Sequence, residues 1–523
     1  MKRLPALHVL FFAVYPVLFA YSRNAGEADL AQVALPFVTV VCGAAVLWVP
    51  ALLVFRERTN ASVALSLFLL WFFLYGHFAA VLRGAGLYMR PRYLLVVWTL
   101  PVLAAAAVIR WRRRPLPRLT SFLNAVSACL VALCLGSLAL FGLTRRSAGR
   151  TADAEVASDP AHGVPAERPD IYYIILDRYA REDVLLGQYG YDNSEFLRYL
   201  GDKGFHVATA ASANYPITPL SLASSLNMQH LVELAQRLGE DATDMLPLYT
   251  LCEDFAVWRF LQQRGYRYVH FGSGYSLTAH NPHANLNINL FALPDFWGIL
   301  YHQTVLQPVL FNLKLYDHRH TKWRREVYEF DHLEAMCPGD QPLFVFAHFL
   351  TTHPPYVFRS DGSYVSEAAE AELPGKQRYA EQVEYANRRL RGFIDHAIAS
   401  ARVPPIIVLQ ADEGPYPLDF RSDRDDFDWR TATAAQFRQK FGILNACYAP
   451  RLPPGALYPA ITPVNTFRVI FRHYFGAGLE PLPDTIYAFV DRLHMYKLHD
   501  VTDKARPAAP ALPSPAGEEP RTP

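Results

Sequence analysis

The sequence predicts a membrane domain of α-helices followed by an α/β domain with a largely parallel sheet. Two features of the 523-residue chain support this prediction. Long stretches without a charged residue fill the first 144 positions, whereas short runs of β-branched and aromatic residues alternate with amphipathic stretches after position 170. Such alternation is typical of parallel sheets, because parallel strands are joined by helical crossovers.

Five stretches near the N-terminus are apolar enough to cross a membrane. They contain no Lys, Arg, Asp or Glu, and they cover residues 4–22, 30–55, 59–82, 93–109 and 119–144. Each has, or nearly has, the roughly 20 residues that a spanning helix needs. We therefore expect five transmembrane helices in residues 1–144. Because the first stretch has no small-residue cleavage site and four more stretches follow it, a removable signal peptide is not expected.

The basic residues beside these stretches predict the orientation. If the N-terminus is cytoplasmic, nine Lys and Arg residues lie inside and four lie in the outside loops. The nine are Lys2, Arg3, Arg56, Arg58, Arg110, Arg112, Arg113, Arg114 and Arg118. Basic residues favour the cytoplasmic side. We expect a multi-pass protein of the plasma (inner) membrane whose chain after Thr144 is extracytoplasmic, although Arg145 and Arg146 weakly oppose this orientation.

Composition divides the remaining chain into three parts. Residues 145–169 are polar, rich in Ala and Pro and without hydrophobic periodicity, which predicts a linker. Residues 504–523 have a similar composition and are expected to be disordered. Between them, residues 170–503 are numerous enough to bury a full hydrophobic core. The net charge of +2 gives no indication of a nucleic-acid partner.

Polar residues follow three of the predicted strands. The strand at 170–176 precedes Asp177, the strand at 343–349 precedes His353, and the strand at 406–410 precedes Asp412 and Glu413. The carboxyl ends of parallel strands meet at one edge of a sheet, so we expect these side chains to lie together. Adjacent carboxylates repel each other unless a cation lies near them. The alternatives are that the acids only begin a turn before Gly-Pro and that His353 is an ordinary loop residue.

The segment from Asn214 to Leu231, "NYPITPLSLASSLNMQHL", predicts a loop that enters a helix. Thr218 or Ser221 would lie near the helix N-terminus. A hydroxyl group in that position faces free backbone N–H groups, which favours an anion and an alkoxide nucleophile. Most Ser and Thr residues at helix starts are only caps, so this segment alone does not identify a nucleophile.

Four motifs, taken together and in this order, resemble the sulfatase-like branch of the alkaline phosphatase superfamily. They are "PDIYYIILDRYARED", "NYPITPLSLASSLN", "FAHFLTTHPPYVF" and "IIVLQADEGP". In particular they resemble membrane proteins such as lipoteichoic acid synthase and the phosphoethanolamine transferases, which have five spans and an extracytoplasmic catalytic domain. Residues 441–476 also look like the C-terminal signature of an uncharacterised group of such proteins. The resemblance covers residues 169–490 and implies an alkaline-phosphatase-like fold.

The resemblance implies a role for each candidate residue. Asp177 would be a metal ligand, and Thr218 would be the nucleophile and would also touch the metal. Asp412 matches the acid of the family's Asp-His-Gly motif, and His353 matches a histidine that contacts the phosphoryl or sulfuryl oxygens of the substrate. A divalent cation between Asp177, Thr218, Asp412 and Glu413 would remove the repulsion between the carboxylates and lower the pKa of the threonine hydroxyl.

The chain departs from the family pattern at two positions. Glu413 stands where the family usually has histidine, and Arg178 stands where glycine is common. A ligand set made only of oxygen favours hard cations, so we expect one divalent metal ion, Mn²⁺ or Mg²⁺, in preference to Zn²⁺. Arg178 could instead pair with a carboxylate and partly replace the metal, which would leave a catalytically degenerate protein. His348 alternates within its strand and is interpreted as a structural residue.

The resemblance implies a membrane-bound transferase of a phospho-alcohol group, of the phosphoglycerol or phosphoethanolamine type. A membrane phospholipid would be the donor, and an extracytoplasmic glycan or lipid would be the acceptor. Two alternatives remain: a sulfatase-like phosphodiesterase that uses water, and a metal-free scaffold of envelope biogenesis. True sulfatase chemistry is disfavoured, because the formylglycine-like pattern "CYAPR" at Cys447 lies far from the family's nucleophile region.

Overall fold

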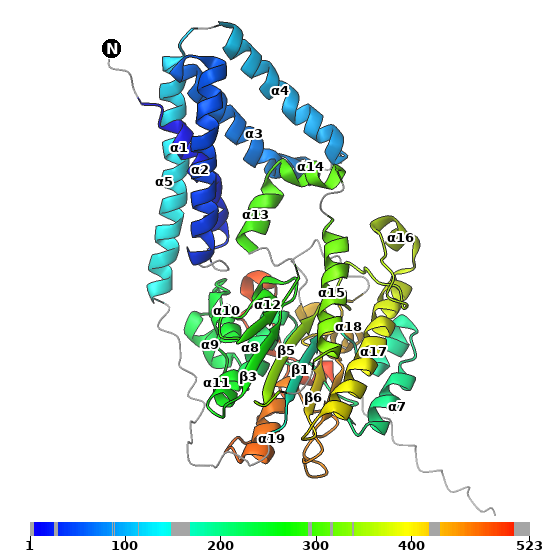
Figure 1. Cartoon of the computed structure of the whole chain (residues 1–523). Coiled ribbons are helices and arrows are strands. Elements are labelled where there is room, and N and C mark those ends of the chain that lie inside the picture. Colours follow the sequence, from blue (N-terminus) through cyan, green and yellow to red (C-terminus); the bar gives the residue numbers. More distant parts are fainter. Residues whose placement is uncertain are drawn as a thin grey trace, which may run out of the picture.

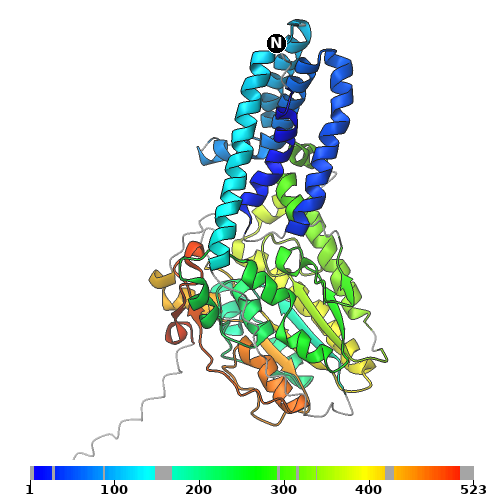
Figure 2. The same cartoon turned by 90° about the vertical axis from the view of Figure 1, so that its left-hand side faces the viewer.

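The computed structural model describes residues 5–25, 30–85, 87, 89–112, 114–147, 168–290, 295–313, 317–336, 339–417 and 429–506. A bundle of helices from the N-terminal part of the chain lies at one end, and an α/β domain lies at the other (Figures 1 and 2). Most of the predicted linker at 145–169, and all but the first three residues of the predicted tail at 504–523, lie outside the described residues.

The N-terminal helices follow the predicted apolar stretches. They are α1 (His8–Arg23), α2 (Leu30–Phe55), α3 (Arg58–Gly84), α4 (Pro91–Arg112) and α5 (Pro117–Ser147). Among the described residues, four of them, α2 to α5, are long and apolar enough to cross a membrane. Helix α1 is apolar but has 16 residues, which corresponds to about 24 Å against a hydrocarbon core of about 30 Å. The count of five spans therefore stays a prediction for α1.

Helix α1 packs against the other helices. Phe12 and Ala13 of α1 are buried together with Leu65 and Phe73 of α3 and Ala44 of α2. It also runs along α5. Much of the remaining surface of α2, α4 and α5 consists of exposed apolar side chains, as expected for helices that face lipid.

The α/β domain is built on one largely parallel sheet. Within the described residues this sheet has seven strands in the order β2-β7-β6-β1-β5-β3-β4. The strands are β1 (Ile171–Leu176), β2 (His206–Val207), β3 (Arg267–Phe271), β4 (Leu286–Ile288), β5 (Leu343–Phe349), β6 (Ile406–Gln410) and β7 (Asn445–Tyr448). The strands predicted at 170–176, 343–349 and 406–410 are β1, β5 and β6; β1 pairs in parallel with β5 and β6, and β3 pairs in parallel with β5. Strand β7, which was not predicted, pairs antiparallel with β6 and with β2.

Strand β1 lies in the middle of the sheet, and every one of its residues is buried. Its sequence, "IYYIIL", is rich in β-branched and aromatic residues, as is typical of a strand covered on both faces. Adjacent residues of a strand point to opposite faces. Accordingly, Tyr172 contacts Phe393 of α17 (Gly375–Ser400), whereas Tyr173 contacts Phe467 of α19 (Pro463–Phe475). Helices therefore cover the sheet from both sides.

The remaining elements of this domain are mostly helical. They are α6 (Glu182–Val184), α7 (Ser194–Asp202), α8 (Thr218–Asn227), α9 (Val232–Leu238), α10 (Leu246–Glu253), α11 (Ala256–Gln262), α12 (Ser276–Ala279), α13 (Asp295–Gln303), α14 (Leu306–Asn312), α15 (His318–Glu334), α16 (Glu367–Glu372), α18 (Ala434–Phe441), α20 (Thr502–Ala505), and the small hairpin of β8 (Tyr487–Ala488) and β9 (His499–Asp500). Helix α8 is buried along its whole length and contacts α10, α11 and α19.

Candidate metal and phosphoryl-transfer site

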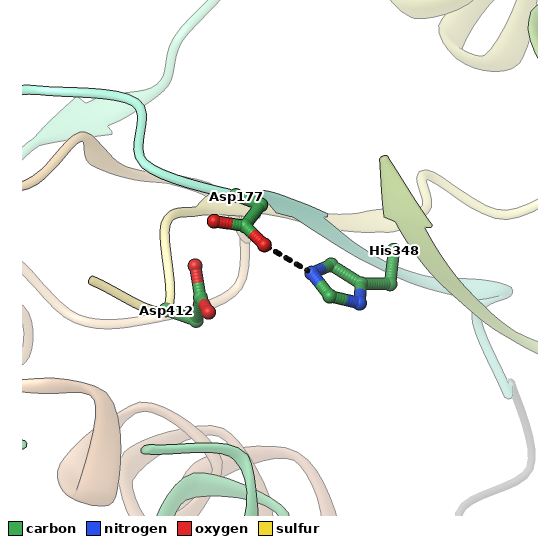
Figure 3. Close-up of side chains that lie close together, drawn as sticks. All are labelled: Asp177, His348 and Asp412. Atoms are coloured by element: carbon green, nitrogen blue, oxygen red, sulfur yellow. Dashed lines mark ion pairs between the residues drawn. The ribbon is translucent and has the colours of Figure 1, made fainter. Parts of the chain in front are cut away.

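Three neighbouring strands bring two aspartates and a histidine together at one edge of the sheet. Asp177 follows β1, His348 is the sixth residue of β5, and Asp412 comes two residues after β6. In the strand register, Ile175 lies beside both His348 and Gln410. The three side chains consequently meet although they are far apart in the sequence (Figure 3). They form a group whose candidate ligand atoms all lie within 4.8 Å of one another.

This group contains buried polar atoms that lack hydrogen-bond partners. His348 Nε2 lies 3.5 Å from Asp177 Oδ2. Among the described residues, Asp177 Oδ1, His348 Nε2 and both carboxylate oxygens of Asp412 are buried without a hydrogen-bond partner. An unpaired buried charge costs several kcal/mol. The residues present therefore fit a divalent cation, which would offset the unpaired charge of the two carboxylates.

The pKa values follow from burial and from the crowding of charges. Burial, together with the neighbouring Asp177 and Glu413 carboxylates, raises the pKa of Asp412 to about 7. Burial also acts to raise the pKa of Asp177, but His353, His348 and Arg178 outweigh it and hold that pKa below its ordinary value. Burial opposes protonation of His348, yet the contact with Asp177 raises its pKa. The two aspartates thus have pKa values shifted in opposite directions.

Thr218 lies at this site. It is the first residue of α8, and Ile217 before it has an extended backbone, so the hydroxyl lies where the helix N–H groups are free. Pro219 follows at a position that needs no N–H donor. The Thr218 hydroxyl interacts with Asp412 and acts to lower the pKa of that carboxyl. Ser221, the alternative nucleophile, donates its hydroxyl to the Tyr215 carbonyl and is buried.

Glu413 points to two cations instead. Its Oε1 accepts a hydrogen bond of 2.9 Å from Arg178 Nε, and its Oε2 lies 2.9 Å from Lys440 Nζ. Lys440, in α18, is fully buried, lies 3.6 Å from the centre of the Tyr416 ring, and also donates to the Gly414 carbonyl. Arg178 and Lys440 therefore neutralise Glu413, which reduces its repulsion of the adjacent Asp412. The role of Glu413 as a metal ligand stays a prediction.

The backbone of this segment allows the close approach of α18. The Gly414 N–H donates to the Lys440 carbonyl over 2.7 Å. A Cβ atom at position 414 would lie 2.4 Å from the Gln439 carbonyl oxygen and 2.7 Å from that of Lys440. Only glycine fits this contact, so Gly414 places the ammonium group of Lys440 beside Glu413.

Arg178 adopts a backbone conformation that favours glycine. Its φ is +63°, which is uncommon for a bulky residue and costs about 1 kcal/mol. The Arg178 carbonyl accepts a hydrogen bond from the Tyr379 hydroxyl, and its guanidinium group lies over the ring of Tyr416. These contacts and the ion pair with Glu413 offset the cost. Glycine would take the same conformation at this position without strain.

His353 lines the same cavity as Asp177, Arg178 and Thr218. Burial lowers the pKa of His353 to about 3, although the nearby Asp177 carboxylate opposes the shift. Its imidazole is therefore neutral at pH 7, and its one N–H, on Nδ1, donates to the Pro354 carbonyl. Its carbonyl accepts a hydrogen bond from Lys322 of α15. This position agrees with the predicted substrate contact but does not test it.

His348 and Lys440 are the two residues that sequence reasoning did not place at the site. The ring of His348 is held by a hydrogen bond of 2.8 Å between its Nδ1 and the Thr278 hydroxyl, which leaves Nε2 facing Asp177. The only sequence signal for His348 was a polar residue within an otherwise apolar strand. Nothing in the sequence around Lys440 distinguishes it from a solvated helical lysine.

The site opens into a cavity of about 1730 Å³ that also reaches the membrane domain. Asn24, which follows α1, and Gln32 of α2 line it together with Asp177 and Thr218. Helices α13, α14 and α15 supply much of the rest of the wall. The predicted nucleophile, Thr218, is thus reached from the side of the molecule that faces the N-terminal helices.

No family model matches this sequence, and a search of curated proteins found no match. The solved structures that are similar include the C-terminal periplasmic domain of EcEptC from Escherichia coli in complex with Zn, at 12% identity and a TM-score of 0.42, over 65% of this chain and 94% of that one. Another is the integral membrane lipooligosaccharide phosphoethanolamine transferase A (EptA) from Neisseria meningitidis, at 12% identity and a TM-score of 0.40, over 89% of this chain and 95% of that one.

A third similar structure is a protein of the alkaline phosphatase superfamily from Vibrio parahaemolyticus, at 13% identity and a TM-score of 0.36, over 67% of this chain and 81% of that one. The similar structures are thus phosphoethanolamine transferases and proteins of the sulfatase and alkaline phosphatase superfamily. These are the kinds of protein that the sequence motifs resemble.

Proposed function

We propose that the protein is a membrane-bound, metal-dependent transferase that moves a phospho-alcohol group, of the phosphoglycerol or phosphoethanolamine type. A membrane phospholipid is the donor, and an extracytoplasmic glycan or lipid is the acceptor. The observation that carries the proposal is the position of Thr218: its hydroxyl lies at a helix N-terminus, beside the unpaired Asp412, in a cavity shared with the membrane domain.

Asp177, His348 and Asp412 are the residues that would hold the metal, with Thr218 beside them. The preference for Mn²⁺ or Mg²⁺ was based on a ligand set made only of oxygen. An imidazole in the set extends the choice to Zn²⁺, while Mn²⁺ also accepts mixed sets. A divalent ion bound there would lower the pKa of the Thr218 hydroxyl and polarise the phosphoryl oxygens. Glu413 becomes a ligand only if its ion pairs with Arg178 and Lys440 break.

The protein's own residues bind and orient the substrate. The Thr218 oxygen attacks the phosphorus in line as its proton is lost, the phosphorus bond to the glyceride oxygen breaks, the diglyceride gains a proton and leaves as an alcohol, and a phosphothreonine diester forms. His353 lies beside the substrate in the cavity, and Arg178, which also lines the cavity, adds positive charge to the site. An acceptor hydroxyl then attacks the phosphothreonine and regenerates Thr218. If water takes the place of the acceptor, the protein is a hydrolase.

The test is the intact mass of the full chain after incubation with a mixed lipid extract. We expect an adduct whose mass identifies the donor head group in the wild type and in Ser221→Ala, and none in Thr218→Ala. Ser221 is a matched control, because its hydroxyl is already donated to a backbone carbonyl. An adduct that persists in Thr218→Ala would exclude Thr218 as the nucleophile. Absence of both adduct and metal in the wild type would favour the scaffold alternative.

A further inference from the structure

Two short helices of the α/β domain leave that domain and pack into the membrane helices. They are α13 and α14, inserted between β4 and α15. They contact α1, α2, α3 and α4, and they lie at the lower end of the N-terminal helices in Figure 1. Together they are named the α13–α14 hairpin below. Its position connects the site to the membrane domain.

The packing of the hairpin is close and specific. Phe296 and Leu300 of α13 are buried with Val17 of α1 and Val33 of α2. The Val305 N–H, between the two helices, donates to the Phe72 carbonyl of α3 over 3.0 Å. A Cβ atom at Gly76 of α3 would lie 2.3 Å from the His302 carbonyl oxygen. The hairpin is therefore fixed against helices of membrane length.

The composition of the hairpin suits the boundary between lipid and water. Apart from Asp295, the first residue of α13, the hairpin is uncharged: residues 296–313, "FWGILYHQTVLQPVLFNL", contain no Lys, Arg, Asp or Glu. The two helices have nine and seven residues, too few to span a membrane. Trp297 and Tyr301 belong to the residue types that are enriched at membrane interfaces. Leu306, Phe311 and Leu313 are 42%, 48% and 62% exposed, so this apolar surface is not covered by the described protein.

The cavity beside the hairpin has walls of different character. Phe296, Ile299 and Phe311 form an apolar wall, whereas α15 supplies a basic one. The basic lining residues of α15 are His318, His320, Lys322, Arg324 and Arg325. Two acidic residues also line the cavity: Asp317, just before α15, and Glu326, within it. Both already accept hydrogen bonds from the protein. Asp317 accepts them from Tyr364 and Arg319, and Glu326 accepts them from Leu350 and Thr351. The cavity therefore suits a ligand with an anionic head and apolar chains.

We propose that the α13–α14 hairpin is embedded in the outer lipid interface and forms the wall through which a phospholipid head group enters the site directly from the bilayer. The basic face of α15 receives the phosphodiester, while the acyl chains stay along Leu306, Phe311 and Leu313. The location of the hairpin in lipid is independent of catalysis. Its role as an entrance rests on the proposed function.

The first test locates the hairpin without using activity. Benzoylphenylalanine replaces Leu313 or, as a control, Leu493, which is 68% exposed in the α/β domain and does not line the cavity. The full chain is placed in vesicles of phosphatidylethanolamine and phosphatidylglycerol and irradiated, and its intact mass is measured. We expect a phospholipid adduct at position 313 and none at position 493. Equal labelling of the two positions, or no adduct at either one, would overturn the proposal.

The second test concerns entry. Leu313→Asp, Leu493→Asp and Thr218→Ala are compared on a phospholipid embedded in vesicles and on a dihexanoyl phospholipid dissolved below its micelle concentration. We expect Leu313→Asp to lower turnover of the embedded lipid about tenfold, equivalent to about 1.4 kcal/mol, and to lower turnover of the soluble lipid by a clearly smaller factor. Leu493→Asp should change neither. Equal effects of Leu313→Asp on both substrates would exclude an entrance, whereas undiminished turnover in Thr218→Ala would instead reject the proposed function.

Discussion

Substitutions at Glu413 and Lys440, made singly and together, test whether Glu413 is a partner of cationic side chains or a metal ligand. In the structure its two oxygens each lie 2.9 Å from a cationic nitrogen, and the Glu413 and Lys440 side chains are 2% and 0% exposed. Removing one partner from a buried ion pair costs about 3–5 kcal/mol. Lys440→Met should therefore destabilise the protein by about 3 kcal/mol, because Glu413 would keep only Arg178 among its cationic partners in the described part of the chain.

Substituting Glu413 rather than Lys440 should destabilise the protein less. Burial lowers the pKa of Lys440 to about 8, although Glu413 opposes the shift. Without Glu413, Lys440 loses its proton at a cost of roughly 1–2 kcal/mol near neutral pH. Glu413→Gln should thus be milder than Lys440→Met, and the double variant should be close to Glu413→Gln. The expected coupling free energy between the two positions is about 3 kcal/mol, because the double variant then lacks the full cost of Lys440→Met.

The assay is denaturant unfolding of the full chain in detergent, followed by calorimetric titration with Mn²⁺ and Zn²⁺. We expect Glu413→Gln to weaken metal binding by no more than about tenfold, because Glu413 would lie beside the ligands without being one of them. Asp412→Asn, which removes a ligand, should weaken metal binding by more than about a hundredfold. Equal losses of metal affinity in these two variants would show that Glu413 is a ligand. Equal instability of Lys440→Met and of the double variant would refute the ion-pair argument.

Three further predictions concern the site and the orientation. Metal affinity should rise about tenfold per pH unit as the pH approaches about 7, because burial raises the pKa of Asp412 and its proton must leave before the metal binds; calorimetry in buffers of different ionisation enthalpy counts the released protons, and a flat profile would contradict it. Gly414→Ala should cost about 1–3 kcal/mol through its clash with α18, whereas Gly375→Ala, with open space at Cβ, should be neutral in the same unfolding assay. A reporter fused after Thr144 should be extracytoplasmic, and a cytoplasmic signal there would exclude the predicted orientation.

The convergence of the acidic residues could be predicted because it depends only on the sheet. Parallel strands place their carboxyl ends at one edge, so Asp177 and Asp412 had to lie near each other once β1 and β6 were neighbours. The direction of Glu413 could not be predicted in the same way. It depends on Lys440, which α18 brings to the site from 27 positions further along the chain.

The role of His348 was missed for a related reason. Period-two alternation shows that His348 lies on one face of β5 but does not say which face holds the site. The packing decides this: Phe346 contacts Tyr173, which contacts Phe467 of α19, so His348 points to the face that α8 also covers. Thr278, from α12, then fixes the ring. These contacts join segments that no local pattern relates.

The charge arrangement also bears on whether the protein is a degenerate scaffold. Arg178 and Lys440 neutralise Glu413, but among the described residues no cationic side chain is paired with Asp412, whose carboxylate oxygens are buried and unbonded. A raised pKa in the folded state means that the Asp412 carboxyl stabilises the metal-free protein only at low pH, and that this stability is lost as the pH rises through about 7. At neutral pH a buried, unpaired Asp412 therefore costs several kcal/mol. A scaffold would gain nothing from that cost, since asparagine would fill the same space without a charge. A dication between Asp177, His348 and Asp412 offsets it, which is why the arrangement favours a metal enzyme.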